Sequence, residues 1–171
     1  MQILDTHGPI TAIVYASGAE FDIVLRDQIA AMARRGLRLA GLIQHRRAVP
    51  GRRKCDMELE DLATGLRHGI SEDRGAAAQG CALDTDGLLR ACDTAAAGLH
   101  GGADLLALSR FGKAEVAGGG CRGLIARALD LGVPVLIGVP ENHLAAFREF
   151  TGGLAHEIAL RVCAGAQAAE G

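Results

Sequence analysis

Two cations follow a short apolar run near the middle of the chain, in the stretch DLLALSRFGKAEVAGGG over residues 104–120. Arg110 and Lys113 come just after the apolar run, and Gly112 between them permits a tight turn. A turn that leads from a strand into a helix presents backbone N–H groups, which hold anions together with cationic side chains. The spacing therefore predicts a site for a small anionic ligand. Further candidate ligands in this stretch are Gly119, Gly120 and Arg122.

An acidic residue, Glu115, lies close to these cations, and we expect it to support the site by fixing one of them. The alternative is a solvated loop with a surface ion pair, which contributes at most about 1 kcal/mol. The position at the carboxyl end of a strand favours the anion site, because ligands of α/β proteins gather there. A P-loop hydrolase would end this strand with a carboxylate for magnesium, whereas this strand ends in Ser109 and Arg110. We therefore expect anion binding without that hydrolytic machinery.

A second candidate turn, YASGAEFD over residues 15–22, occupies the place of a phosphate loop after the first apolar run. A working P-loop, G-x-x-x-x-G-K-[ST], needs a lysine on the phosphates and a hydroxyl on magnesium. Here Phe21 stands where the lysine belongs, and Asp22 stands where the hydroxyl belongs. Two interpretations stay open: a remnant phosphate site supported by Asp22, or an ordinary turn whose acidic residues stabilise the helix dipole. In the first interpretation the anion ligands are Ser17, Gly18 and Ala19.

The elements that must position these turns follow from hydrophobic periodicity. Apolar runs of strand length occupy residues 10–16, 37–44, 57–62, 104–109, 133–139 and 154–162, with a hairpin return at 66–70. Helical spacing occupies residues 21–35, 84–99, 121–131 and 141–150. This alternation predicts an α/β fold of three layers, a mostly parallel sheet with helices on both faces. Residues 17–22, 110–120 and 140–143 should then meet at the carboxyl ends of the strands. We expect one domain over residues 1–163 and a disordered tail over 164–171.

Composition restricts the partners of the chain. The formal net charge of −2 gives no reason to expect nucleic acid, and no apolar run is long enough for a membrane span. The basic run HRRAVPGRRK over residues 45–54 reads as a solvated loop unless a ligand is found against it. Five cysteines without a CxxC pair favour reduced thiols and a cytoplasmic protein, and the scattered histidines predict no metal site.

Five motifs carry a resemblance to a known family. They are LAGLIQ (39–44), CDMELEDLATGLR (55–67), GCALD (80–84), DLLALSRFGKAEVAGGGCR (104–122) and VPVLIGVP (133–140). The chain resembles a bacterial family of unknown function that is distantly similar to P-loop nucleoside-triphosphatases of thermophile type. Members of that family are commonly associated with molybdenum-uptake or molybdoenzyme genes. The resemblance extends from Ile10 to about Gly153.

The resemblance implies a P-loop-like fold with a degenerate P-loop. In the nucleoside-triphosphatases a D-E-x-G-K turn follows the strand; here Ser109 and Arg110 replace the two acids, while Gly112 and Lys113 remain. We therefore expect a non-hydrolytic protein that binds a nucleotide or an oxyanion, molybdate included. The alternatives are a slow triphosphatase, in which Asp22 or Glu115 recruits magnesium, and a regulatory or scaffold subunit with a vestigial pocket. A homo-oligomer and a molybdenum-related protein partner both remain open.

Overall fold

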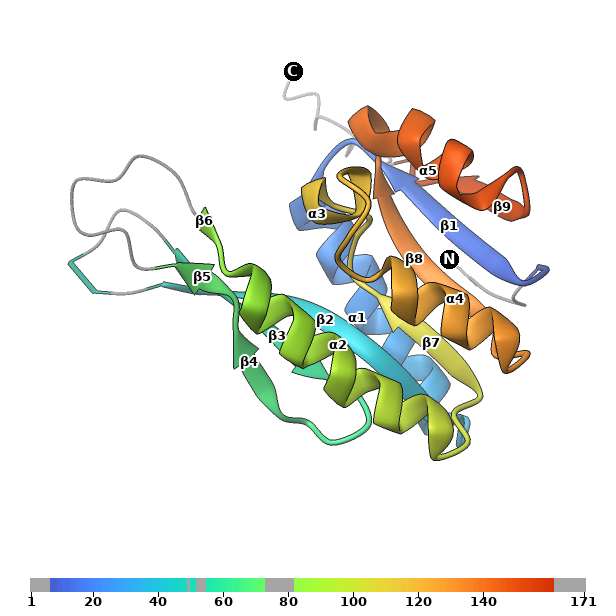
Figure 1. Cartoon of the computed structure of the whole chain (residues 1–171), viewed down its shortest axis with the longest axis horizontal. Helices are drawn as coiled ribbons and strands as arrows, with labels where there is room; N and C mark the ends of the chain where they lie inside the picture. Colours follow the sequence, from blue (N-terminus) through green and yellow to red (C-terminus); the bar gives the residue numbers. More distant parts are fainter. Residues whose placement is uncertain (1–6, 49, 52–54, 73–81, 162–171) are drawn as a thin grey trace, which may run out of the picture.

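The computed structural model describes residues 7–48, 50–51, 55–72 and 82–161. Its main sheet has seven strands in the order β4-β3-β2-β7-β8-β1-β9 (Figure 1). The strands are β1 (Ile10–Tyr15), β2 (Leu39–Ala48), β3 (Cys55–Asp61), β4 (Arg67–Gly69), β7 (Leu105–Leu108), β8 (Val135–Pro140) and β9 (Ala155–Ala159). Strands β2, β7, β8, β1 and β9 are parallel, and β3 and β4 add an antiparallel hairpin. The predicted mostly parallel sheet is confirmed. A separate antiparallel pair joins β5 (Ser71–Glu72) to β6 (Ala82–Leu83).

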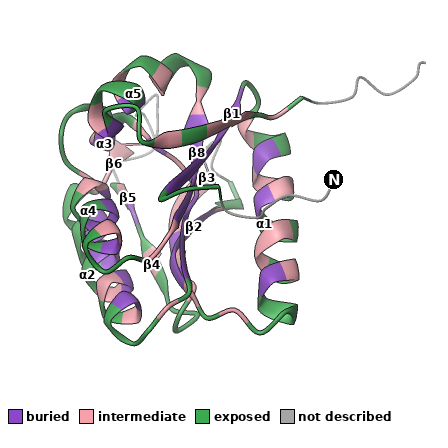
Figure 2. Ribbon diagram, turned by 90° about the vertical axis from the view of Figure 1, so that its right-hand side faces the viewer, coloured by how far each residue is buried: buried purple, intermediate pink, exposed green. Residues whose placement is uncertain are grey.

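Helices cover both faces of the sheet, as predicted. In the described part of the chain, α1 (Gly18–Arg34) covers one face by itself, and α2 (Thr85–His100) and α4 (Arg122–Asp130) cover the other (Figure 2). Helix α5 (Leu144–Thr151) lies on the α2 side, where Phe147 joins the core cluster of α2 and α4. The short helix α3 (Lys113–Val116) and the 3-10 turn η1 (Glu141–His143) follow β7 and β8 at their carboxyl ends.

The sheet separates two hydrophobic clusters, which explains why its strands read as continuous apolar runs. The α1 cluster contains Ile13, Tyr15, Phe21, Leu25, Met32, Ile43, Leu105 and Leu136. The larger cluster lies under α2, α4 and α5 and includes Leu42, Leu106, Leu108, Ile125 and Phe147. Alternate residues of one strand thus supply opposite cores, as Ile43 and Leu42 of β2 do. The buried residues line both sides of the sheet in Figure 2.

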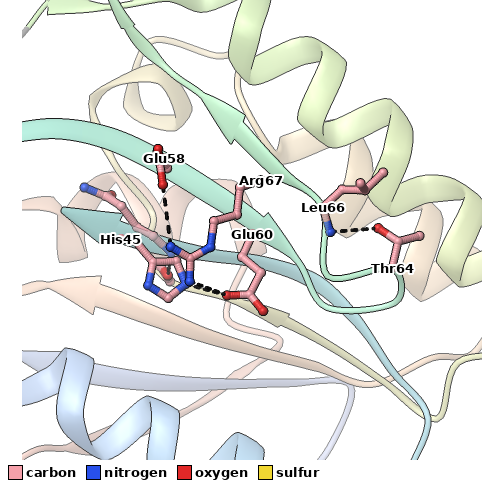
Figure 3. Close-up of polar contacts among 8 residues, drawn as sticks. His45, Glu58, Glu60, Thr64, Leu66 and Arg67 are labelled. Carbon is pink, nitrogen blue, oxygen red and sulfur yellow. Dashed lines mark hydrogen bonds and ion pairs between the residues drawn. The ribbon is translucent and has the colours of Figure 1, made fainter. Parts of the chain in front are cut away.

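The basic run 45–54 differs from its predicted form. Its first four residues, 45–48, extend β2 instead of forming a loop, because they pair with the acidic strand β3. The His45 imidazole lies 2.7 Å from a carboxylate oxygen of Glu60, and Arg47 lies 3.7 Å from Glu58. Arg67 of β4 contacts both glutamates, so the positive charge of this hairpin is largely compensated (Figure 3).

The three predicted segments do meet at the carboxyl ends of the parallel strands. Tyr15 at the end of β1 is in register with Pro140 at the end of β8. His143 of η1 donates a hydrogen bond from Nδ1 to the backbone oxygen of Phe111, 2.9 Å away. The predicted tail 164–171 falls outside the described residues. Among the described residues, no helix is both long and apolar enough to span a membrane.

Candidate functional site at the carboxyl edge of the sheet

The turn after β1 is too short to wrap a phosphate. Only Ala16 and Ser17 separate the strand from α1, and the Phe21 N–H already donates to the Ser17 carbonyl at 3.2 Å. The Phe21 side chain is fully buried and stacks on Tyr15, with ring centroids 4.3 Å apart and planes 5° apart. A Cβ atom at Gly138 of β8 would overlap the Phe21 ring, so that glycine makes room for it. At the position where a P-loop has its lysine, this chain thus has a phenylalanine that belongs to the hydrophobic core.

Arg110 connects the two predicted turns. Its Cγ and Cδ lie 3.7 Å from the place that a Cβ would take at Gly112, and its Nη2 lies 3.7 Å from the same point at Gly18. The side chain therefore runs from the turn after β7 to the first turn of α1. No carboxylate of the described residues forms an ion pair with Arg110 or with the exposed Lys113, and the buried Arg110 Nε has no hydrogen-bond partner. The N–H groups at the start of α1 add partial positive charge beside this guanidinium.

Tyr15 contributes an unused hydroxyl to this positive region. Its side chain is 4% exposed, and its hydroxyl oxygen is buried without a hydrogen-bond partner among the described residues. Burial raises the pKa of Tyr15, and Asp22 acts in the same direction, whereas the charges of Arg110 and Arg46 oppose the rise. The phenol is thus neutral at physiological pH and can donate to a bound anion. The Tyr15 hydroxyl and the Arg110 Nε–H group, both buried without a partner among the described residues, mark a place where polar groups lack partners.

Glu115 performs a different task from the one expected. Its carboxylate is 4% exposed and accepts hydrogen bonds from the backbone N–H groups of Gly112, at 2.7 Å, and Cys121, at 2.8 Å. It therefore closes the α3 loop on itself and does not pair with Arg110 or Lys113. Gly120 is required here, because it has a positive φ of 58° and a Cβ would overlap the carboxylate. The loop closure therefore explains the last glycine of the triple-glycine run.

Two other predicted ligands of the turn after β7 are engaged in contacts of their own. The Gly119 N–H donates to the Ala114 carbonyl at 2.9 Å, so it is not free for a ligand. The Arg122 guanidinium lies over the Phe150 ring, 4.7 Å from its centroid, and its Nε donates to the Glu115 carbonyl. Of the predicted set, the structure gathers Arg110, Gly112, Lys113 and Glu115 around one cavity, with Gly18 next to Arg110. Ser17 and Ala19 lie exposed at the start of α1, and Asp22 is half-buried in its next turn.

Ser109, at the end of β7, replaces the expected magnesium carboxylate and ties two strands together. Its hydroxyl accepts a hydrogen bond from the Gln44 backbone N–H at 2.6 Å, and its own N–H donates to Leu42. The side chain is buried, so it acts as a structural link between β7 and β2.

A cavity of about 320 Å³ lies at this edge of the sheet, on the face that α2 covers. Its walls include Leu42, Met57, Leu59, Ile70, Leu88 and Leu108. The polar groups that line it are Gln44, Ser109, Arg110, Lys113, Glu115 and His143. An apolar interior with a few convergent polar groups is the usual composition of a ligand site.

Two thiols lie beside the cavity. The Sγ atoms of Cys92 and Cys121 are 3.4 Å apart, and Cys121 lines the cavity wall. The hydrogen bond between the two sulfurs lowers the pKa of Cys92, while the same bond and burial raise the pKa of Cys121 well above its ordinary value. Among the described residues, no cluster of three or more potential metal ligands exists. Cys81 lies outside the described residues.

Sequence reasoning missed Tyr15, Gln44 and the apolar walls of the cavity. A tyrosine at the end of a buried strand reads as core, and its stacking on Phe21 shows that most of the ring is core. The apolar walls carry no signal in the sequence, because their residues satisfy the same strand and helix periodicity as packed ones. His143 was included in the segment expected at this edge.

Comparison with known proteins supports the fold. The chain is 34% identical over 145 residues to a protein of Bradyrhizobium diazoefficiens named "Molybdenum import ATP-binding protein ModC 2". The match covers 85% of this chain and 16% of that protein, so the chain spans a small part of its length.

Among solved structures, the crystal structure of THEP1 from the hyperthermophile Aquifex aeolicus matches with a TM-score of 0.55 and 14% identity. That match covers 91% of this chain and 90% of THEP1, and it shows a shared fold. The P-loop-like fold that the resemblance implied is thereby confirmed. Residues 10–166 match the family model described as "Protein of unknown function (DUF2478)", and the chain belongs to this family.

Proposed function

We propose that this protein binds a small anionic ligand, a nucleotide or an oxyanion, at the carboxyl edge of its sheet. The observation that carries the proposal is the pair Arg110 and Lys113, two cations without an acidic partner among the described residues, which line one cavity. By contrast, Arg47 and Arg67 of the neighbouring β2–β3–β4 hairpin pair with glutamates. Unpaired cations beside a helix N-terminus favour an anion.

Binding without P-loop hydrolysis has the better support. Phosphoryl transfer relies on a lysine at the phosphates and on a carboxylate for magnesium. Phe21 fills the first position with core, and Ser109 at the second is occupied in tying β7 to β2. Glu115, the candidate for a magnesium ligand, already accepts two backbone hydrogen bonds.

A link to molybdenum rests on the name of the relative. The matched part covers 16% of that molybdenum import protein, so molybdate and tungstate belong in the ligand screen beside phosphate, ATP and GTP. The unpaired Arg110 and Lys113 support an anion as the ligand, and the titrations below identify which of these anions binds.

Isothermal titration calorimetry with these five anions tests the proposal. We expect saturable binding of at least one, weakened tenfold or more in Arg110→Ala and in Lys113→Ala. Arg26→Ala is the matched control, because Arg26 is an exposed arginine in the middle of α1. Unchanged affinity in both cavity variants would remove the site, and a complete absence of binding would favour a scaffold role.

Magnesium-dependent phosphate release from ATP and GTP tests hydrolysis separately. We expect no rate above that of buffer alone. A rate that requires magnesium and disappears in Glu115→Gln would instead support a slow triphosphatase.

A further inference from the structure

We propose that the ligand is an organic anion with an apolar body of ring size, whose body lies in the cavity on the α2 face and whose anionic group contacts Arg110 and Lys113. This inference rests on the proposed anion site and adds the class of the ligand. It places the body on the sheet face opposite α1, away from the position of a phosphate loop.

The walls of the cavity are apolar residues of the hydrophobic core. Leu42 and Leu108 are 1% exposed and belong to the larger hydrophobic cluster, as do Leu59 and Leu88, yet all four line a space of about 320 Å³. An apolar body against these walls makes dispersion contacts with them, whereas an inorganic oxyanion has no apolar surface with which to do so.

The polar residues of the lining are placed to contact the polar edge and the anionic group of such a ligand. Lys113 is exposed and Arg110 is half-buried, so their charges lie toward the solvent side of the cavity. His143 donates from Nδ1 to Phe111, and its neutral form therefore leaves Nε2 as an acceptor. Gln44, also in the lining, carries an amide with both donors and acceptors. A ring with polar edges suits this arrangement.

The size of the cavity sets the scale of the ligand. A volume of about 320 Å³ lies at the lower end of the range for small-molecule sites, which runs from about 300 to 1,000 Å³. One or two rings with an anionic substituent fill such a space, and a longer chain of phosphates would have to extend into solvent past Lys113.

Three probes distinguish the contribution of the apolar body to affinity from that of the anionic group. They are 1-naphthyl phosphate, which has both parts, 1-naphthol, which has the body alone, and inorganic phosphate, which has the charge alone. Calorimetry should show that 1-naphthyl phosphate binds at least tenfold more tightly than either part alone. Arg110→Ala should bring its affinity down to that of 1-naphthol. Guanosine monophosphate as a fourth probe tests a nucleobase as the body, and binding with the same dependence on the cavity walls would support the placement.

A cavity-filling variant tests where the body lies. Leu88→Phe adds volume at the cavity wall, and Leu89→Phe, its exposed neighbour on α2, is the matched control. We expect Leu88→Phe to weaken 1-naphthyl phosphate tenfold or more and Leu89→Phe to leave it unchanged. Ala114→Phe, at the half-buried rim, gives a second test should Leu88→Phe fail to fold.

The outcomes distinguish the two proposals. If inorganic anions or ATP bind in an Arg110-dependent manner that Leu88→Phe and Ala114→Phe do not change, the anion site stands and the apolar-body inference is overturned. If 1-naphthyl phosphate binds no better than phosphate, the inference is also overturned. If no probe depends on Arg110 or Lys113, both proposals fail.

Discussion

Phe21 lies flat against Tyr15, the last residue of β1, and both rings belong to the core on the α1 face of the sheet. This stacking joins the start of α1 to the carboxyl edge and brings Gly18 next to Arg110. Phe21, the clearest departure from a P-loop sequence, therefore helps to hold the candidate site together.

Removal of the Phe21 ring should cost stability. Phe21→Ala deletes a fully buried ring. Such deletions lower the free energy of unfolding by about 3–5 kcal/mol, because the surrounding side chains only partly fill the space that the ring leaves. Urea denaturation followed by circular dichroism measures the change. Ile23→Ala, an exposed position on the same helix, should change the free energy of unfolding by less than about 0.5 kcal/mol. A small loss in Phe21→Ala would contradict the packing described here.

Tyr15 reports on the charge of Arg110. It is the only tyrosine of the chain, so ultraviolet absorbance titrates it without interference. Burial raises its pKa in the folded protein, and Arg110 opposes the rise, so Arg110→Ala should raise the pKa further, while Arg26→Ala should not. Because the folded pKa exceeds the unfolded one of about 10, this group's contribution to stability is present below about pH 10 and is lost as the pH rises toward the folded value. An unchanged pKa of Tyr15 in Arg110→Ala would contradict an effect of the Arg110 charge on the Tyr15 hydroxyl.

Neutralising Glu115 should loosen the α3 loop. Both carboxylate oxygens accept backbone N–H groups, and a glutamine would place an NH₂ group against one of these donors. Leaving a buried donor unsatisfied costs about 1–3 kcal/mol, so Glu115→Gln should lose that much in urea denaturation. Glu149→Gln, at an exposed position of α5, removes the same charge and should have no measurable effect. Equal effects of the two variants would show that charge, not loop closure, is what matters.

Much of the fold could be predicted from the sequence because buried parallel strands read as apolar runs and helices read as 3.6-residue stripes. The extension of β2 could not, because its charges look like a loop until β3 supplies Glu58 and Glu60 across the ladder. The proximity of the turns after β1 and β7 could be predicted, because the carboxyl ends of parallel strands lie at the same edge of a sheet.

The role of Glu115 could not be read from sequence, since a carboxylate three residues after Gly112 suits an ion pair and a backbone cap equally. The cavity was equally hidden, because packing around a void depends on the relative placement of β2, β3 and α2, which no local pattern records.

The two thiols beside the cavity should react as a pair. The Cys92 and Cys121 sulfurs lie 3.4 Å apart, and a disulfide requires about 2.0 Å, so a small movement suffices. The hydrogen bond between the two sulfurs lowers the pKa of Cys92, so we expect the Cys92 thiolate to add to the N=N bond of diamide and the Cys121 sulfur then to displace the reduced diamide from Cys92. Diamide accepts the two electrons and two protons as it is reduced to the hydrazine, and the protein gains one S–S bond.

Peptide mapping by mass spectrometry after diamide treatment of the folded protein measures this reaction. We expect a cross-linked pair of peptides that contain Cys92 and Cys121, formed faster as the pH rises because the thiolate fraction increases. Cys92→Ser should abolish that cross-link while Cys121 stays alkylatable after denaturation. If 1-naphthyl phosphate occupies the cavity that Cys121 lines, its saturating presence should slow the reaction, whereas inorganic phosphate should not. Free Cys92 and Cys121 after full exposure to diamide would contradict the proximity of the two sulfurs.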